Sequence, residues 1–203
     1  MNVYEKGNGV ILEGVTDFDP VHIFECGQCF RWHKQEDGSY TGVAKGRILN
    51  VKKENDKIYL NNTNLKEFNS IWYNYFDLGT DYTEIKNKLK NMDEYLNKAT
   101  EFGWGIRILR QDGWEMLISF IISSNNRIPM IQRAIENLSR KFGKYIGEYE
   151  GNEYYAFPTP EELNKASQEE IRACQTGFRD KYIKSTTQAV IENNDEVSEY
   201  TNL

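Results

Sequence analysis

The most constraining feature of this chain is an almost unbroken apolar run from Trp114 to Ile122, followed by the polar string SSNNR over 123–127. Asp112 precedes the run, and Glu115, the charged residue within it, lies three residues after Asp112. This is the spacing of a helix-capping pair. A helix with so little polar surface is expected to be wrapped by protein on all sides.

A second helix is expected directly after the polar string. Pro129 suits its first position, because the missing N–H is not needed there, and Gly143 marks its end. The apolar residues between them fall on one stripe: Ile131, Ala134, Ile135, Leu138 and Phe142. The string therefore lies where N–H groups at a helix end point outward, an arrangement that suits a polyanion.

The two halves of the chain differ in periodicity. Short β-branched or aromatic segments predict strands at 10–15, 28–33, 40–44, 48–52 and 58–60, joined as antiparallel hairpins. From residue 65 onward the apolar spacing is helical, and a last helix is expected over about 180–193. We therefore predict an α+β chain with a sheet domain and flanking helices over 1–99 and a partial helical domain over 100–203.

Composition predicts a folded protein without a membrane partner. Apolar residues make up 39% of the 203 residues, which is enough for a core. No run approaches the roughly 18 apolar residues of a membrane span, and no signal peptide is evident at the N-terminus. Three cysteines argue against a disulfide framework. We expect an intracellular monomer, in the cytoplasm and nucleoid or in the nucleus.

Charge is distributed unevenly along the chain. The net charge of −6 argues against a nucleic-acid partner, but residues 100–147 hold seven basic and four acidic side chains, whereas residues 148–203 hold five and twelve. The basic segment contains the SSNNR string. Because local charge governs phosphate binding, composition permits a nucleic-acid partner, although a solvated helix face would give the same excess.

Three motifs, in this order, resemble one known family. The strings GQCFRW (27–32), LRQDGWEMLISFIISSNNRI (109–128) and GFRDKY (177–182) are similar to those of the 8-oxoguanine DNA glycosylases of the Ogg type. The resemblance implies a TATA-binding-protein-like sheet domain, followed by part of an all-α glycosylase domain. It also implies base excision repair of double-stranded DNA that contains 8-oxoguanine, by a glycosylase with AP lyase activity and no cofactor.

The resemblance assigns DNA-binding roles to three residues. A nucleotide that leaves the duplex opens a hole in the base stack. The family pattern places Asn125 in this hole with Arg179 beside it, and Phe178 as an aromatic wedge between base steps. The residues alone also allow Asn125 to be a cap or turn residue and Phe178 to be part of the core.

Three neighbouring positions complete the expected DNA contact. Asn126 and Arg127 belong to the same loop, and Arg127, where the family often has a third asparagine, is expected to contact a phosphate. Met130 stands where the mammalian enzymes carry an arginine that reads the base opposite the lesion. Because methionine offers cytosine no hydrogen-bond donor, we predict weaker discrimination of the opposite base.

Gly27 is the expected lesion-binding residue. 8-oxoguanine bears a hydrogen at N7, where guanine has a lone pair, so a backbone carbonyl attracts one base and repels the other. The resemblance assigns this carbonyl to Gly27, whose missing side chain allows a close approach. Alternatively, the glycine eases the start of the strand at 28–33.

A zinc set and a redox pair are possible from the same region. His22, Cys26, Cys29 and His33 could form a two-Cys, two-His zinc site. In a strand at roughly 3.3 Å per residue, Cys29 and His33 would be about 13 Å apart, too far to share one ion. We therefore expect no metal. A reactive thiol usually lies at a helix N-terminus, and Cys29 is predicted to lead into a strand, so a redox pair is also disfavoured.

The family's nucleophile is missing from these residues. It is a lysine in a helix-hairpin-helix, which displaces the base and forms a Schiff base. After Gly177 the chain contains no glycine to form a Gly-x-Gly hairpin, and Lys181 and Lys184 lie on another element. We therefore expect no catalytic residue, a chain that is inactive alone, and a C-terminal segment elsewhere that carries the lysine. The alternative is a non-catalytic DNA-binding or lesion-sensing module.

Overall fold

The computed structural model describes residues 1–193, which form two compact units. The first unit comprises residues 1–42 and 49–110, and the second comprises residues 43–48 and 111–193. Within residues 1–193, no helix combines the length and the apolar character that crossing a membrane requires.

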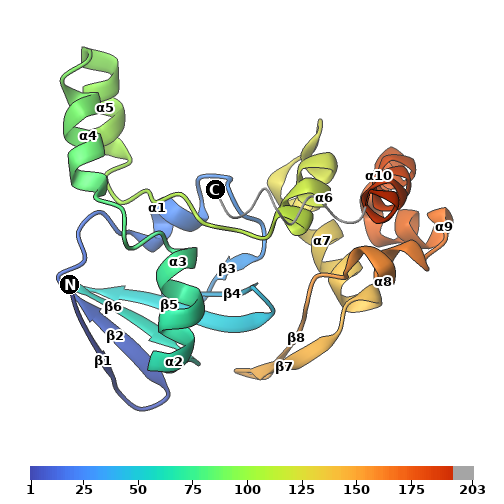
Figure 1. The fold of residues 1–203 in the computed structure, drawn as a ribbon, viewed down its shortest axis with the longest axis horizontal. Coiled ribbons are helices and arrows are strands. Elements are labelled where there is room, and N and C mark those ends of the chain that lie inside the picture. Colours follow the sequence, from blue (N-terminus) through green and yellow to red (C-terminus); the bar gives the residue numbers. More distant parts are fainter. Residues whose placement is uncertain (194–203) are drawn as a thin grey trace. The chain divides into compact units, whose positions relative to one another are not determined.

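A six-stranded antiparallel sheet, in the order β1-β2-β6-β5-β4-β3, forms the base of the first unit (Figure 1). Its strands are β1 (Asn2–Glu5), β2 (Gly9–Glu13), β3 (Trp32–Lys34), β4 (Tyr40–Ala44), β5 (Arg47–Glu54) and β6 (Lys57–Asn61). The predicted α+β class is therefore confirmed. The sequence pattern missed β1, which pairs with β2 from Asn2 opposite Glu13 to Glu5 opposite Val10.

The predicted strand over 28–33 is wrong in its extent, because β3 begins only at Trp32. The segment before it follows helix α1 (Pro20–Phe24), which the sequence analysis missed although Asp19 accepts a hydrogen bond from the Val21 amide as its N-cap. Side-chain bonds of Gln28 to Ile23 and to residues 107–109 hold this segment as a loop, so it does not join the ladder.

A continuous helical segment, α2 (Leu65–Glu67), a π-helical turn (Phe68–Trp72) and α3 (Tyr73–Tyr75), lies across the sheet (Figure 1). Two indole N–H groups fix its position: Trp32 donates to the Tyr75 hydroxyl and Trp72 to Thr63 Oγ1, both at 2.9 Å. An aromatic core includes Trp72 and Tyr75 from this segment together with Phe18, Phe24, Trp32 and Phe76.

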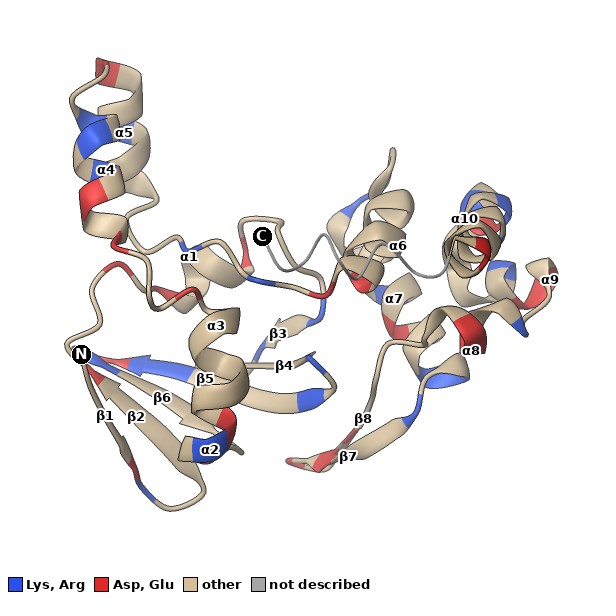
Figure 2. Cartoon of the chain, in the orientation of Figure 1, with Lys and Arg blue, Asp and Glu red and all other residues tan. Residues whose placement is uncertain are grey.

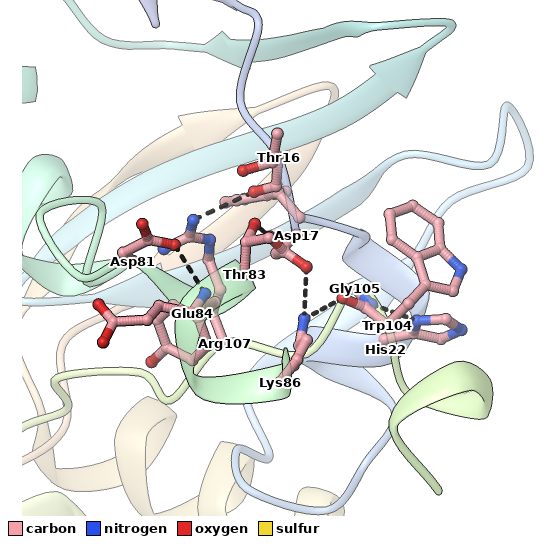
Figure 3. Close-up of polar contacts among 12 residues, drawn as sticks. Thr16, Asp17, His22, Asp81, Thr83, Glu84, Lys86, Trp104, Gly105 and Arg107 are labelled. Atoms are coloured by element: carbon pink, nitrogen blue, oxygen red, sulfur yellow. Dashed lines mark hydrogen bonds and ion pairs between the residues drawn. The ribbon is translucent and has the colours of Figure 1, made fainter. Parts of the chain in front are cut away.

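The helical hairpin of α4 (Tyr82–Lys90) and α5 (Glu94–Phe102) is attached to the same unit by a polar network (Figure 3). Asp17 accepts hydrogen bonds from Thr83 Oγ1 and, at 3.0 Å, from Lys86 Nζ, which also donates to the Trp104 carbonyl. Burial raises the pKa of Asp17, but these donors outweigh burial and leave the pKa below its usual value. The buried Arg107 donates to the Thr16 carbonyl at 3.1 Å and closes the network.

The second unit is mainly helical. Its elements after residue 111 are α6 (Gly113–Ser123), α7 (Ile128–Phe142), β7 (Tyr145–Tyr149), β8 (Asn152–Tyr155), α8 (Pro160–Asn164), α9 (Gln168–Ile171), a π-helical turn (Arg172–Thr176), a 3-10 turn (Gly177–Arg179) and α10 (Asp180–Glu192). The β7–β8 hairpin was not predicted. Acidic residues gather toward its tip, as Figure 2 shows.

Helix α6 is less enclosed than its sequence predicts. Trp114, Ile118 and Ile122 are buried on the side that packs on α7 and α10, but Phe120 is 75% exposed. The expectation that protein wraps this helix on all sides is therefore wrong for the described residues. The stripe predicted for α7 is confirmed at Ile131, Ala134, Ile135 and Leu138, which are all buried.

Candidate nucleic-acid interface

The loop between α6 and α7 presents the predicted polar string. Asp112 caps α6 by accepting a hydrogen bond from the Glu115 amide at 3.0 Å, as the spacing predicts. Helix α7 begins at Ile128, so that Pro129 occupies its second position and not its first. The intervening loop is short, and most of it is exposed.

Within this loop, the two asparagines differ in their surroundings. Asn126 is tied to the protein: its Nδ2 donates to the Ile122 carbonyl at 3.1 Å and its Oδ1 accepts from the Arg127 amide at 2.9 Å. Asn125 is exposed and adopts a φ of +49°, a left-handed conformation that asparagine tolerates better than most residues. Asn126 therefore shapes the loop, whereas the amide of Asn125 is available for a ligand.

An open hollow of about 440 Å³ lies beside this loop. It is lined by Asn125, Asn126, Arg127 and Met130. Its lining combines amide groups, one guanidinium and one thioether, and Met130 is exposed at its wall. The hollow thus offers hydrogen-bonding and apolar surface together, as a nucleobase requires.

The third motif lies against the same loop. A left-handed Gly177, with a φ of +62°, begins the 3-10 turn, and Phe178 projects from it with 55% of its surface exposed. Arg179 is only 7% exposed. Its Nε donates to the Ser124 carbonyl at 3.0 Å and its Nη2 to the Asn125 carbonyl at 2.9 Å. The structure thus brings together the three residues expected at the hole in the duplex, with Arg179 turned toward the protein.

Asp180 fixes the start of α10 directly after this turn. Its carboxylate is fully buried and accepts hydrogen bonds from Arg172 Nε at 2.6 Å, from the Lys181 amide at 2.7 Å and from Gln168 Nε2 at 3.2 Å. Burial raises the pKa of Asp180, but these donors outweigh burial and hold the pKa below its usual value. The Phe178 turn is therefore held from both sides, by Arg179 and by Asp180.

The two lysines of α10 occupy different surroundings. Lys184 Nζ donates to the carbonyls of Asn164, at 2.6 Å, and Ala166, at 2.9 Å, so its ammonium group ties α10 to α8 and the turn after it. Lys181 is exposed, with its Nζ 4.8 Å from the centre of the Tyr182 ring. The hydrogen bonds of Lys184 thus give this side chain a structural role, whereas Lys181 faces solvent.

The loop that carries Gly27 belongs to the first unit. Gly27 is exposed, has a φ of +86°, and has open space on the side where a Cβ would lie. The left-handed conformation alone favours glycine here, and the open space leaves room for a ligand to approach. Because β3 starts at Trp32, the alternative that Gly27 eases the start of a strand at 28–33 loses its basis.

Gln28 is a residue of this loop that the sequence analysis did not single out. Its Nε2 donates to the carbonyls of Ile23 and Arg107, both at 2.9 Å, and its Oε1 accepts from the Leu109 amide at 3.0 Å. One side chain thus joins the Gly27 loop to the backbone of α1 and to that of residues 107–109. Its position between Gly27 and Cys29 in the first motif was the available signal.

Three of the four candidate zinc ligands have different surroundings in the structure. His22 accepts a hydrogen bond from the Gly105 amide at its Nδ1, as Figure 3 shows, while Cys29 is buried and Cys26 is exposed. The distance argument against zinc assumed a strand over 28–33 and loses that premise. Among residues 1–193, no group of three or more His, Cys, Asp or Glu side chains is arranged to hold a metal ion.

Comparison with known families agrees with this geometry. Residues 10–117 match the 8-oxoguanine DNA glycosylase N-terminal domain, and residues 118–200 match the HhH-GPD superfamily of base excision DNA repair proteins. The chain belongs to the 8-oxoguanine DNA glycosylase family.

Individual relatives agree with this assignment. The chain is 28% identical over 172 residues to the N-glycosylase/DNA lyase OGG1 of Arabidopsis thaliana, covering 82% of this chain and 47% of that protein. Among solved structures, MBOgg1 in complex with a low-affinity DNA ligand is 53% identical, covering 95% of this chain and 66% of that chain, with a TM-score of 0.91.

A Clostridium acetobutylicum 8-oxoguanine glycosylase/lyase, bound to double-stranded DNA with cytosine opposite 8-oxoG, is 46% identical with a TM-score of 0.92. The match covers 96% of this chain and 66% of that chain. The chain thus spans about half of the Arabidopsis relative and two thirds of the two structures.

Proposed function

We propose that this chain provides the lesion recognition and the DNA contact of an 8-oxoguanine DNA glycosylase with AP lyase activity, which acts in base excision repair. The observation that carries the proposal is that Arg179 contacts both the exposed Phe178 ring and the exposed Asn125 loop, which lines a hollow of about 440 Å³. The DNA-bound structure of the Clostridium acetobutylicum relative supports double-stranded DNA with 8-oxoguanine as the ligand.

Each side chain has a physical task in this proposal. Moving the damaged nucleotide out of the duplex costs a few kcal/mol of stacking and pairing. The exposed ring of Phe178 recovers on the order of 1–3 kcal/mol by stacking on a base. The amide of Asn125 fills the vacated space and bonds the base left behind, while Arg127 contacts a phosphate. The Gly27 carbonyl accepts the N7 hydrogen of the lesion, which guanine lacks.

The chemical step requires a nucleophile, which these DNA-contacting residues do not supply. Lys184 is bound to two carbonyls, and Lys181 lies on α10 and not in a Gly-x-Gly hairpin. We therefore propose that residues 1–203 bind lesion DNA without cleaving it, and that the nucleophilic lysine belongs to a further segment. A lesion-sensing module without chemistry would bind in the same way, but the Arabidopsis relative is an N-glycosylase/DNA lyase, which favours the enzyme.

Binding and trapping experiments test both parts of the proposal. The 203-residue chain is titrated into labelled duplexes with 8-oxoG opposite cytosine or with an undamaged G·C pair, and is then treated with borohydride. We expect tighter binding to the lesion duplex and no covalent adduct. Equal affinity for the two duplexes would refute lesion recognition. A trapped adduct would refute the absence of a nucleophile and would call for peptide mapping of the modified lysine.

A further inference from the structure

We propose that Arg179 is a positioning residue that joins the Phe178 ring to the Asn125 loop, so that ring and amide enter the duplex as one rigid unit. The inference rests on the function proposed above and adds to it. It assigns to Arg179 a task within the protein, in addition to the DNA contact that the resemblance implies.

The guanidinium group of Arg179 is almost fully used by backbone carbonyls. Its Nε and Nη2 donate to Ser124, its Nη2 also donates to Asn125, and its Nη1 donates to the Thr176 carbonyl at 3.3 Å. Carbonyls at the end of a helix lack partners within that helix and attract positive charge. Arg179 therefore caps the end of α6 and, with the same group, holds the turn from which it comes.

This contact also explains how Asn125 keeps its conformation. A residue other than glycine with a φ of +49° lies in a sparsely populated region, and it stays there only when its surroundings hold it. The bond from Arg179 Nη2 to the Asn125 carbonyl fixes the peptide on the carboxyl side of this residue. Loss of that bond frees the loop to relax.

The Phe178 ring is attached to the same guanidinium. The central carbon of the Arg179 guanidinium lies 4.4 Å from the centre of the ring, within the range of a cation–π contact. More than half of the Phe178 surface stays exposed. One planar group thus contacts both the ring and the Asn125 loop. Lysine, a compact point charge, lacks the planar fork that makes these contacts together.

A double-mutant cycle on the 203-residue chain tests this coupling. Affinity for the 8-oxoG·C duplex is measured for Asn125→Gly, which tolerates the positive φ, for Phe178→Leu, and for the double variant. The same affinity measurements are repeated on chains that also carry Arg179→Lys. We expect the losses to deviate from additivity by at least about fivefold when Arg179 is present, and to be additive within about twofold with lysine. Coupling that persists with lysine, or additive losses with Arg179, would overturn the proposal.

A spectroscopic measurement separates this proposal from the proposed function. In the DNA-free protein, we expect the Nε–H of Arg179 to exchange slowly with water, and that of the exposed Arg133 on α7 to exchange fast. Equal exchange rates would overturn the positioning role. Because this measurement uses the wild-type protein, it does not depend on whether any variant folds. If the wild-type chain shows no preference for lesion DNA, the proposed function fails and the exchange rates alone decide the role of Arg179.

Discussion

Replacing Gln28 with alanine removes the side chain that joins the lesion-binding loop to its surroundings. At least three hydrogen bonds are lost: two donated by Nε2 to the carbonyls of Ile23 and Arg107, and one accepted from the Leu109 amide. Each such bond contributes about 0.5–1.5 kcal/mol net. Because Gln28 is only half-buried and water can reach part of the site, we expect the lower half of the summed range, about 2 kcal/mol.

The same change should weaken the choice between the lesion and guanine. Gly27 adjoins Gln28, so a loop released from Ile23 and Leu109 no longer holds the Gly27 carbonyl in place. If the difference in binding free energy between the two duplexes falls by about 1.4 kcal/mol, roughly the contribution of one hydrogen bond, the ratio of affinities for 8-oxoG·C over G·C falls about tenfold.

Urea unfolding and competition binding measure the two effects. Gln35→Ala is the matched control, since Gln35 lies in the same unit and its side chain donates a solvent-exposed hydrogen bond to the nearby His33 carbonyl. We expect the control to change neither quantity by more than a few tenths of a kcal/mol. A Gln28→Ala variant as stable and as selective as Gln35→Ala would refute the assigned role of Gln28.

Two further predictions concern the second unit. Met130→Arg places a hydrogen-bond donor at the hollow, and a good pair with the opposite base is worth about 1–3 kcal/mol. Binding assays with each of the four opposite bases should therefore show a new preference for cytosine of roughly tenfold or more. An unchanged preference would contradict the role assigned to Met130. Asp180→Asn tests the buried carboxylate. The pKa of Asp180 is lower in the folded than in the unfolded protein, so its ionised carboxylate stabilises the fold above about pH 4. This contribution to the free energy of unfolding is lost as the pH falls through the folded pKa. The unfolding free energies of wild type and variant should therefore converge at low pH, and a constant difference between them would be evidence against this linkage.

Local rules predicted much of the second unit. The cap at Asp112 and the apolar stripe of α7 follow from spacing within one helix, and both are confirmed. These features depend on neighbours within a few residues, so a single sequence contains the information. The division at residues 99 and 100 stays a prediction.

Other features depend on partners that the sequence pattern does not identify. Strands β7 and β8 are barely buried, so their sequence has no alternation of apolar and polar residues to mark them. Phe120 is apolar without being enclosed by the described residues. The Arg179 side chain points toward the protein because it donates to the backbone carbonyls of Ser124 and Asn125. Every residue has a backbone carbonyl, so the sequence does not indicate which ones accept such a bond.

The most direct measurement places 2-aminopurine next to 8-oxoguanine in a duplex and records its fluorescence at saturating protein. If Asn125 and Phe178 take the place of an extruded nucleotide, the wild-type chain raises the fluorescence, because 2-aminopurine loses the purine on which it was stacked. The double variant Asn125→Gly with Phe178→Leu should then leave it near the level of free duplex. A double variant that raises the fluorescence as much as wild type would contradict the account.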